Sequence, residues 1–352
     1  MIMALGASDT GKSTLIKEAA DAILAMGRSV ALIDLDLGQG EIGPPCAIHA
    51  ARLDGDFHSR QRYRTESVDG GRTADGRHLP ITSCFIGGIT PVGRLLDLCI
   101  GAIRLCEAVK EYSPDVVLVD TCGLVSGAVG RALKQRLIEA LRPDIVLALQ
   151  RETELEAILA STNGLSRPRV IRVPVGSVVG RKSPATRATR RAARFLAAFE
   201  GAKPVTYAFE EIGLIGQSFC LGTEFGLPAR TFIEKSLGSP VLSATVVPDG
   251  LGFVVVANDR WNESAAQEIV AAIKCKRLQI VPQSNYAYLV VGMIDREGAM
   301  CGIGVIESID FQRRQLTVLS RCSSMMVAQI RFGNYRARPN GREIGDVRVG
   351  DL

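Results

Sequence analysis

The chain has 352 residues, of which 47% are hydrophobic and 22% charged, a balance typical of a globular protein with a large core. This length exceeds one ordinary domain and suits two. The net charge of +5 permits an anionic partner without requiring one. Because no run of about eighteen apolar residues occurs, we expect no membrane span and no membrane among the partners.

Nine cysteines and three histidines are scattered along the chain, without a C-x-x-C pair and without the spacing of a metal site. Reduced, mostly buried cysteines of this kind are typical of the cytoplasm. We therefore expect a cytoplasmic protein.

Short apolar strands alternate with helical patterns over the first half of the chain. We expect strands at 2–5, 29–36, 81–88, 114–123, 143–150 and 169–176, and helices at 12–26, 93–112, 131–141, 152–161 and about 181–199. Residues 53–78 lack periodicity and are interpreted as a surface excursion. This alternation predicts an α/β domain over 1–203, with a parallel sheet wrapped by helices on both faces.

The pattern changes near residue 204. From about 240 onward, seven apolar segments are separated by Gly, Asn, Asp and Pro, and only 262–274 has the pattern of a helix. We expect a smaller β-rich C-terminal domain over 204–352, built as a small barrel or sandwich.

A glycine loop follows the first strand. Residues 6–13 satisfy the P-loop (Walker A) pattern G-x-x-x-x-G-K-[ST] and lie between a strand and a helix. In such loops, backbone N–H groups surround the phosphates, the lysine bridges the β- and γ-phosphates, and the hydroxyl binds Mg²⁺. The predicted nucleotide-binding residues are Gly6, Ala7, Ser8, Asp9, Thr10, Gly11, Lys12, Ser13 and Thr14.

The P-loop alone leaves kinase, ATPase, GTPase and motor functions open. GTP-binding relatives usually carry N-K-x-D or T-K-x-D after a late strand. Here the strand IVLALQ is followed by Arg-Glu-Thr, and neither motif occurs elsewhere. We therefore expect ATP, or a relaxed choice of nucleotide.

Two aspartates lie at the end of the second strand. Asp34 and Asp36 alternate with leucine, so they face the same side of an extended chain. Carboxylates at this end of an α/β sheet lie where ligands bind. A carboxylate in this place can hold Mg²⁺ through water or accept a proton from an attacking hydroxyl. The alternative is that both aspartates only cap the strand end and the turn after it.

The helix expected near 181–199 is strongly basic. Residues 181–203 contain seven Lys or Arg against one acid, Glu200. Arg187 and Arg191 are four residues apart and share one face, which Arg194 extends. Guanidinium groups placed in this way can close over a transferring phosphoryl group. The alternative is an ordinary solvated helix face.

Four stretches of the chain together resemble one family. They are LIDLDLGQGEIGPP (32–45), FIGGITPVGR (85–94), VLVDTCGLVSGAVG (117–130) and VVGRKSPATRATRRAARFLAAF (178–199). In this order they resemble the polynucleotide 5′-hydroxyl kinases, which include the kinase subunit of the pre-mRNA cleavage machinery and the pre-ribosomal RNA processing kinases.

The resemblance implies ATP and Mg²⁺ as cofactors and a 5′-hydroxyl of RNA or single-stranded DNA as acceptor. It implies catalytic roles for Lys12, Asp36, Gln39, Thr121, Arg187 and Arg191, and metal binding by Ser13 and Asp36. It also implies a nuclease or ligase as a protein partner in RNA processing.

The sequence departs from the family at two residues of the same segment. Leu124 stands where the family often has a tryptophan that can stack a base, and Asp120 adds a carboxylate that can face a metal. Two alternatives therefore stay open. One is a nucleotide-switched P-loop ATPase of the partition or metal-insertase type, and the other is a catalytically weakened RNA-processing scaffold.

Overall fold

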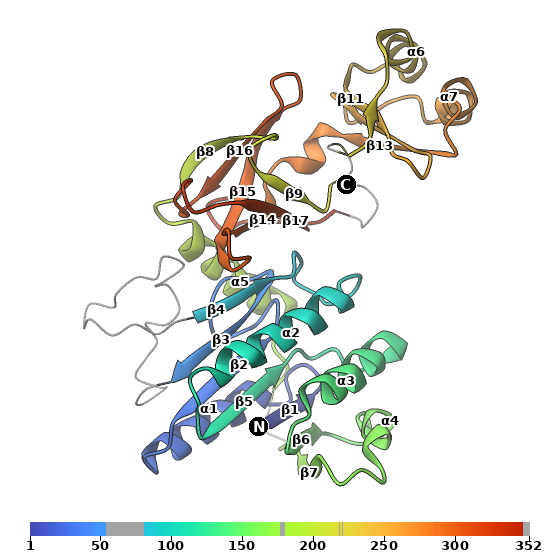
Figure 1. Ribbon diagram of the computed structural model, residues 1–352. Helices are drawn as coiled ribbons and strands as arrows, with labels where there is room; N and C mark the ends of the chain where they lie inside the picture. Colours follow the sequence, from blue (N-terminus) through green and yellow to red (C-terminus); the bar gives the residue numbers. More distant parts are fainter. Residues whose placement is uncertain (54–80, 177–179, 218, 220, 348–352) are drawn as a thin grey trace. The chain divides into compact units, whose positions relative to one another are not determined.

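The computed structural model describes residues 1–53, 81–176, 180–217, 219 and 221–347. They form two compact units, Met1–Glu200 and Gly201–Leu352, which are described separately below (Figure 1). The surface excursion expected at 53–78 lies, except for its first residue, outside the described residues.

The first unit contains a seven-stranded sheet with the order β4-β3-β2-β5-β1-β6-β7. Its strands are β1 (Ile2–Gly6), β2 (Val30–Leu35), β3 (Ala47–Leu53), β4 (Ile81–Phe85), β5 (Val116–Thr121), β6 (Ile145–Gln150) and β7 (Arg169–Pro174). In the part of the sheet with the order β2-β5-β1-β6-β7, neighbouring strands run parallel. The strand β3 runs antiparallel to both of its neighbours, β2 and β4. The sheet is therefore mixed and not fully parallel.

The antiparallel strand β3 was not expected from the sequence. Its residues, AIHAARL, contain three alanines and an arginine and only one β-branched residue, so their intrinsic preference for a strand is weak. Pairing with β2 on one side and β4 on the other makes this segment a strand.

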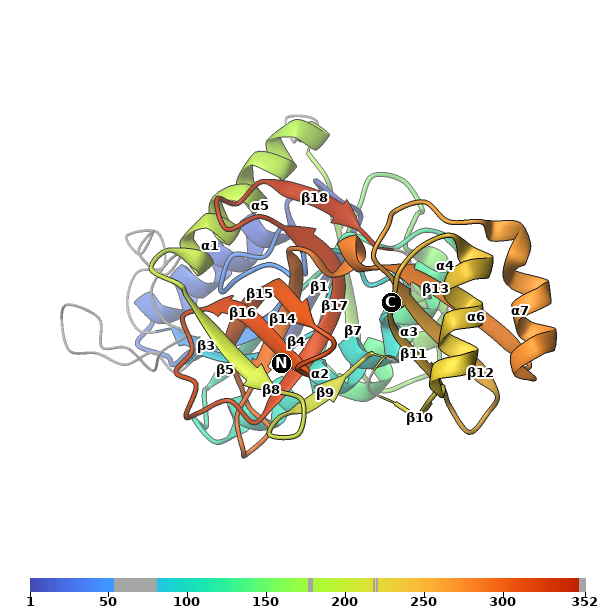
Figure 2. The ribbon, with the colours of Figure 1, turned by 90° about the horizontal axis from the view of Figure 1, so that it is seen from above.

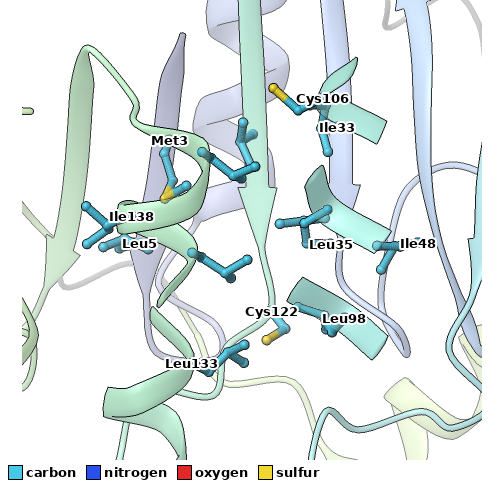
Figure 3. Packing of buried hydrophobic residues seen from close by; sticks show 14 of the residues in the cluster. Met3, Leu5, Ile33, Leu35, Ile48, Leu98, Cys106, Cys122, Leu133 and Ile138 are labelled. Carbon is cyan, nitrogen blue, oxygen red and sulfur yellow. The ribbon is translucent and has the colours of Figure 1, made fainter. Parts of the chain in front are cut away.

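Helices cover both faces of the sheet (Figure 1). The helices of this unit are α1 (Lys12–Ala25), α2 (Leu95–Lys110), α3 (Gly127–Leu141), α4 (Glu156–Leu159) and α5 (Pro184–Phe199), with a 3₁₀ turn at Ala160–Thr162. Ile16 and Ala20 of α1 pack in one core cluster with Leu32. Leu98 of α2 and Leu133 of α3 pack in a second cluster with Leu35, as Figure 3 shows. Because neighbouring residues of β2 join different clusters, this central strand is buried on both faces.

The helix expected at 152–161 is much shorter in the structure. The Glu154 carboxylate accepts hydrogen bonds from the backbone N–H groups of Arg151 and Glu152, each at 2.9 Å. These bonds hold the first residues in a loop, so α4 begins only at Glu156.

The basic helix α5 begins three residues later than expected. The Ser183 hydroxyl caps it by accepting a hydrogen bond from Thr186 N at 3.1 Å, and Pro184 occupies its first turn. A serine cap followed by proline is a strong start signal, so residues 181–183 form the approach to the helix.

The second unit contains two sheets, a larger and a smaller one. The larger consists of β8 (Lys203–Ala208), β14 (Leu289–Ile294), β15 (Met300–Asp310), β16 (Gln315–Ser320), β17 (Gln329–Ala337) and β18 (Glu343–Asp346), with β9 (Gly213–Ile215) beside β17. The smaller consists of β10 (Thr223–Glu224), β11 (Val241–Val246), β12 (Leu251–Val256) and β13 (Arg277–Pro282).

Two helices pack against the smaller sheet, α6 (Leu227–Leu237) and α7 (Ala266–Ile273), which Figure 2 shows side by side. Short 3₁₀ helices at Glu263–Ala265 and Gln283–Tyr286 flank α7 and β13. We expected only the second α-helix, at 262–274. The signals for α6 were nevertheless present, because Pro228 lies in its first turn and Gly238 ends it in a left-handed conformation.

Candidate active site

The carboxyl ends of three strands meet at one edge of the first unit's sheet. Asp34 of β2 lies in register with Asp120 of β5, and Asp120 also pairs with Ala4 of β1. The segments that follow these strands are the P-loop, the loop containing Asp36 and the turn at 122–124. All three are therefore brought to the same edge.

The P-loop conformation depends on its two glycines. Gly11, at the start of α1, has a left-handed φ of 88°. A Cβ on Gly6 would lie 2.5 Å from Thr10 Oγ1 and 2.7 Å from the Leu149 carbonyl oxygen. The loop can therefore close tightly only with glycine at both positions.

Lys12 points back onto its own loop. Its ammonium is buried and donates a hydrogen bond to the Ala7 carbonyl at 2.7 Å. Burial lowers the pKa of Lys12, and the nearby Asp120 carboxylate opposes this shift. The ammonium thus lies at the wall of the loop, within reach of any phosphate the loop holds.

The two aspartates of the second strand have different environments. Asp34 is buried and accepts hydrogen bonds from the N–H groups of Asp36 at 3.0 Å, Glu41 at 2.5 Å and Ile42 at 3.3 Å. Burial and the neighbouring Asp120 raise the pKa of Asp34 to about 7. Asp34 therefore caps the loop that follows it.

Asp36 lies on the wall of a cavity. Its Oδ1 accepts hydrogen bonds from Gly38 N at 3.0 Å and Gln39 N at 2.8 Å, which fixes the carboxylate at the start of the turn. Gln39 lines the same cavity, and its Nε2 donates to the Arg187 carbonyl at 3.2 Å. The turn is thereby attached to the basic helix.

The last residue of β5, Thr121, is a predicted site residue that lies away from the cavity. Thr121 is buried, and its hydroxyl donates to the Ala4 carbonyl at 2.8 Å, so it joins two strands of the sheet. Cys122, Gly123 and Leu124 line the cavity instead.

Asp120 is the carboxylate beside the P-loop. It is buried, and its side chain is hydrogen-bonded to Ser13. Burial raises the pKa of Asp120 to about 6, and its Oδ1 has no hydrogen-bond partner among the described residues. Our metal prediction named Ser13 and Asp36, and it interpreted Asp120 as a further carboxylate that can face a metal. In the structure, Asp120 lies near the end of a strand that pairs with the P-loop strand β1.

The arginines of α5 contact the loops of the sheet edge. Arg187 forms an ion pair with Asp9 of the P-loop, and Arg190 pairs with Glu41 at 2.5 Å. Arg194 is buried and donates to the Ile42 carbonyl at 2.7 Å. The helix therefore lies across the edge of the sheet that holds the P-loop, and Arg194 serves this packing.

A cavity of about 500 Å³ lies between these segments, a volume within the range of small-molecule sites. Lys12, Asp36, Arg187 and Arg191 all line it, although they come from three separate parts of the sequence. The lining residues also include Ser8, Asp9, Thr10, Gly11, Ser13, Thr14, Gly38, Gln39, Ile89, Thr90, Pro91, Cys122, Gly123, Leu124, Ser126, Gly180, Lys182 and Arg190. Gly6, Ala7 and Thr121 lie outside the lining.

The described residues contain no group of three or more His, Cys, Asp or Glu side chains suited to hold a metal ion. A P-loop metal site needs none, because a hydroxyl, phosphate oxygens and water supply most of the ligands. Within the same ranges, none of the helices has both the length and the apolar character required to span a bilayer.

Comparison with known families decides the relationship. A family model described as the mRNA cleavage and polyadenylation factor CLP1 P-loop matches residues 6–201, more than half of the chain. The chain belongs to this family. The resemblance that we inferred from the four motifs is thereby confirmed.

Individual members of the CLP1 P-loop family match the chain along most of its length. A polyribonucleotide 5′-hydroxyl-kinase of Pyrococcus furiosus is 30% identical and one of Pyrococcus abyssi 31% identical. Each alignment covers 98% of this chain and 89% of the relative. Clp1 of Xenopus tropicalis, also called a polyribonucleotide 5′-hydroxyl-kinase, is 22% identical, with 91% of this chain and 66% of the relative covered.

A solved structure shares the fold. The wild-type Clp1p–Pcf11p complex contains a chain that matches with a TM-score of 0.60 at 15% identity, covering 95% of this chain and 74% of that one. The expected fold class, a P-loop α/β sheet followed by a β-rich part, is confirmed, with the antiparallel β3 as the correction within the sheet.

Proposed function

We propose that this member of the CLP1 P-loop family is an ATP-dependent polynucleotide 5′-hydroxyl kinase. It transfers the γ-phosphoryl group of ATP to the 5′-hydroxyl of RNA or single-stranded DNA. The observation that carries the proposal is the shared cavity, where Lys12, Asp36, Arg187 and Arg191 line the same space. The names of the archaeal relatives support the choice of acceptor.

The nucleotide binds in the P-loop. Backbone N–H groups at the start of α1 take the phosphates, and the Lys12 ammonium exchanges the Ala7 carbonyl for oxygens of the β- and γ-phosphates. Asp9 is engaged by Arg187 in the present structure, so a nucleotide competes with Asp9 for this arginine.

The transfer replaces one P–O bond by another. The 5′-oxygen forms a bond to the γ-phosphorus, the bond from that phosphorus to the β,γ-bridging oxygen breaks, and ADP leaves with that electron pair. The proton of the 5′-hydroxyl passes to the Asp36 carboxylate, which lines the cavity. Arg187 and Arg191 neutralise the charge on the equatorial oxygens of the moving phosphoryl group.

The residues present fit a magnesium ion. The unpartnered Oδ1 of Asp120 and the hydroxyl of Ser13 lie together beside the P-loop, and both are hard oxygen donors. Ser13 would bind the ion, while Asp120 or Asp36 would hold it through water. When bound, Mg²⁺ would supply positive charge that offsets the negative charge of the nucleotide's phosphates.

Two further predicted residues take positioning roles in this proposal. Gln39 connects the Asp36 turn to the Arg187 carbonyl, so it orients the base relative to the arginines. Thr121 ties β5 to β1 through the Ala4 carbonyl and acts on the cavity only through the strand ends.

The acceptor is bound mainly through its backbone. Leu124 lines the cavity where an aromatic side chain would stack a base, whereas Lys182, Arg190 and Arg191 supply positive charge. A nuclease or ligase partner and a cytoplasmic location, both expected from the sequence, stay predictions.

The test measures transfer of the γ-phosphate from labelled ATP to matched RNA and DNA oligonucleotides. Oligonucleotides with a 5′-hydroxyl should become labelled, and the same oligonucleotides with a 5′-phosphate should not. Chelation of Mg²⁺ and the Lys12→Ala variant should each abolish labelling. Release of free phosphate without any labelled oligonucleotide would instead identify an ATPase and overturn the proposal.

A further inference from the structure

A buried lysine lies behind the candidate active site. Lys134 of α3 is fully buried, and its Nζ donates a hydrogen bond to the Cys122 carbonyl at 2.6 Å and lies 3.5 Å from Cys122 Sγ. Among the described residues, no carboxylate forms an ion pair with it. A buried ammonium without a carboxylate partner is costly for folding, so its presence points to a role in the site.

The hydrogen bond from Lys134 fixes the orientation of one peptide group. The peptide between Cys122 and Gly123 is trans and planar, so its C=O and N–H point in opposite directions. Because the carbonyl is directed at Lys134, the Gly123 N–H is directed away from α3, on the side of the cavity that Gly123 lines. No acceptor within the described part of the chain takes this N–H.

Gly123 is also held tightly against the P-loop. A Cβ at this position would lie 2.3 Å from Ser8 Oγ and 2.6 Å from Ser8 N. Figure 3 shows the Cys122 side chain turned into the core, in the same cluster as Leu133 of α3. The turn is therefore fixed from three directions, by the P-loop, by the core and by Lys134.

We propose that Lys134 is a positioning residue for phosphoryl transfer. Its ammonium holds the Cys122 carbonyl so that the Gly123 N–H donates a hydrogen bond to an oxygen of the transferred phosphoryl group. The identity of that group rests on the proposed kinase function. A cation on the carbonyl also polarises the peptide, which strengthens the N–H as a donor.

The contribution of Lys134 is greatest when the phosphoryl group is in transit. In the transition state, negative charge is spread over the equatorial oxygens, where a fixed donor is most effective. The positive charge of Lys134 also acts on this region, because Lys134 and Lys12 interact electrostatically. ADP alone has no γ-phosphoryl group, so its binding should depend little on Lys134.

The experiment compares binding of ADP with binding of ADP plus aluminium fluoride, a mimic of the transferring group, in the presence of Mg²⁺. Calorimetry is performed on the full chain and on Lys134→Met and Lys134→Gln. The control is Arg136→Met, because Arg136 lies on the same helix but is exposed and pairs with Glu139. Lys134→Met should bind ADP within about twofold of the unsubstituted chain and bind the mimic about 10- to 100-fold more weakly.

Steady-state turnover should show the same contrast between an effect on the transferring group and an unchanged affinity for the nucleotide. In Lys134→Met, kcat should fall by about the same factor while KM for ATP stays near that of the unsubstituted chain. Lys134→Gln keeps a neutral donor to the Cys122 carbonyl. Its kcat and its affinity for the mimic should lie between those of Lys134→Met and those of the unsubstituted chain. Unchanged binding of the mimic by Lys134→Met would overturn the proposal.

A measurement without substitution keeps the proposal testable if the variants do not fold. In the full chain, ADP with aluminium fluoride should slow hydrogen exchange of the Gly123 amide relative to ADP alone, and equal exchange would overturn the proposal. The two proposals fail separately. If the chain binds the mimic tightly but labels no oligonucleotide, the kinase function is rejected and the role of Lys134 is not. If Lys134→Met turns over at the normal rate, the role of Lys134 is rejected and the kinase function is not.

Discussion

At the scale of single residues, the two aspartates after β2 show how burial assigns roles. Both follow the same strand and are only two residues apart. Asp34 is 1% exposed, and its carboxylate accepts hydrogen bonds from three backbone N–H groups, whereas Asp36 lines the cavity. A general base needs access to the hydroxyl that it deprotonates, so only Asp36 is suited to this role.

Replacing each aspartate should therefore have a different result. Asp36→Asn should lower kcat for transfer by about 10²- to 10⁴-fold, because the proton of the hydroxyl loses its acceptor, while ATP affinity changes little. Asp34→Asn should lower the free energy of unfolding, because a buried cap is disturbed. Steady-state kinetics and urea unfolding of both variants separate these effects. If the two variants had the same loss of kcat and the same free energy of unfolding, the assignment of Asp36 as the base and Asp34 as the cap would be contradicted.

His49 predicts a dependence of stability on pH. It is buried, and its ring nitrogens bond the Ser83 hydroxyl at 2.8 Å and the Pro44 carbonyl at 2.9 Å. Burial lowers the pKa of His49 from 6.5 to about 3. The unfolded chain therefore binds more protons than the folded chain between these values, and stability falls as pH drops through this window, by on the order of a few kcal/mol.

Comparison with His49→Gln isolates this contribution. The raised pKa values of Asp34 and Asp120 act in the opposite sense, since these groups favour the folded state as pH falls. The variant should be less stable at pH 7, and its stability should decline less than that of the unsubstituted chain between pH 6.5 and 4. Urea unfolding across this range measures the difference, and parallel curves would contradict the role of His49.

At the scale of elements, α5 is a basic helix whose arginines serve different purposes. Arg194 is buried against the loop after β2, Arg190 pairs with Glu41, and Arg187 pairs with Asp9. Lys17 of α1 also pairs with Glu41, at 2.8 Å, so this carboxylate connects two helices. These contacts hold the helix in place and leave Arg187 and Arg191 at the cavity.

Removal of the cavity arginines should affect the rate more than binding. Arg187→Ala and Arg191→Ala should each lower kcat by roughly 10³-fold, because guanidinium groups stabilise the charge of the moving phosphoryl group. Arg172→Ala is the matched control, since Arg172 lies on β7 and pairs with Glu156 outside the cavity. Steady-state kinetics with a 5′-hydroxyl oligonucleotide measure kcat for all three variants. A loss of kcat in Arg172→Ala as large as in Arg187→Ala and Arg191→Ala would contradict a direct role of the cavity arginines.

At the scale of the whole molecule, the described chain forms two units, and the described residues that line the cavity belong to Met1–Glu200. The second unit contributes a seven-stranded and a four-stranded sheet, with α6 and α7 packed on the smaller. Nucleotide binding is accordingly assigned to the first unit.

Nucleotide should stabilise the protein through the first unit. A non-hydrolysable ATP analogue with Mg²⁺ at 100 times its Kd should add about 2.7 kcal/mol to the free energy of unfolding of that unit. Calorimetric melting should show the transition shifted upward, and Lys12→Ala should remove the shift. A shift of the same size in the variant would mean that the analogue binds outside the P-loop.

The sequence by itself determined the features that depend on residues close together in the chain. The P-loop spacing, the alternation of strands and helices, the basic helix and the four family motifs are all local patterns, and they were sufficient for the fold class and the family. These patterns can be recognised in the sequence because turns, helix caps and helix faces are formed by residues only a few positions apart.

Only the tertiary structure decided what depends on burial and on partners distant in the sequence. It made β3 a strand through its neighbours, separated the roles of Asp34 and Asp36, turned the Thr121 hydroxyl toward Ala4, and placed Lys134 behind Gly123. The spacing of residues cannot show which side chain is enclosed or which backbone group faces it. These properties arise only when strands and helices far apart in the chain pack together.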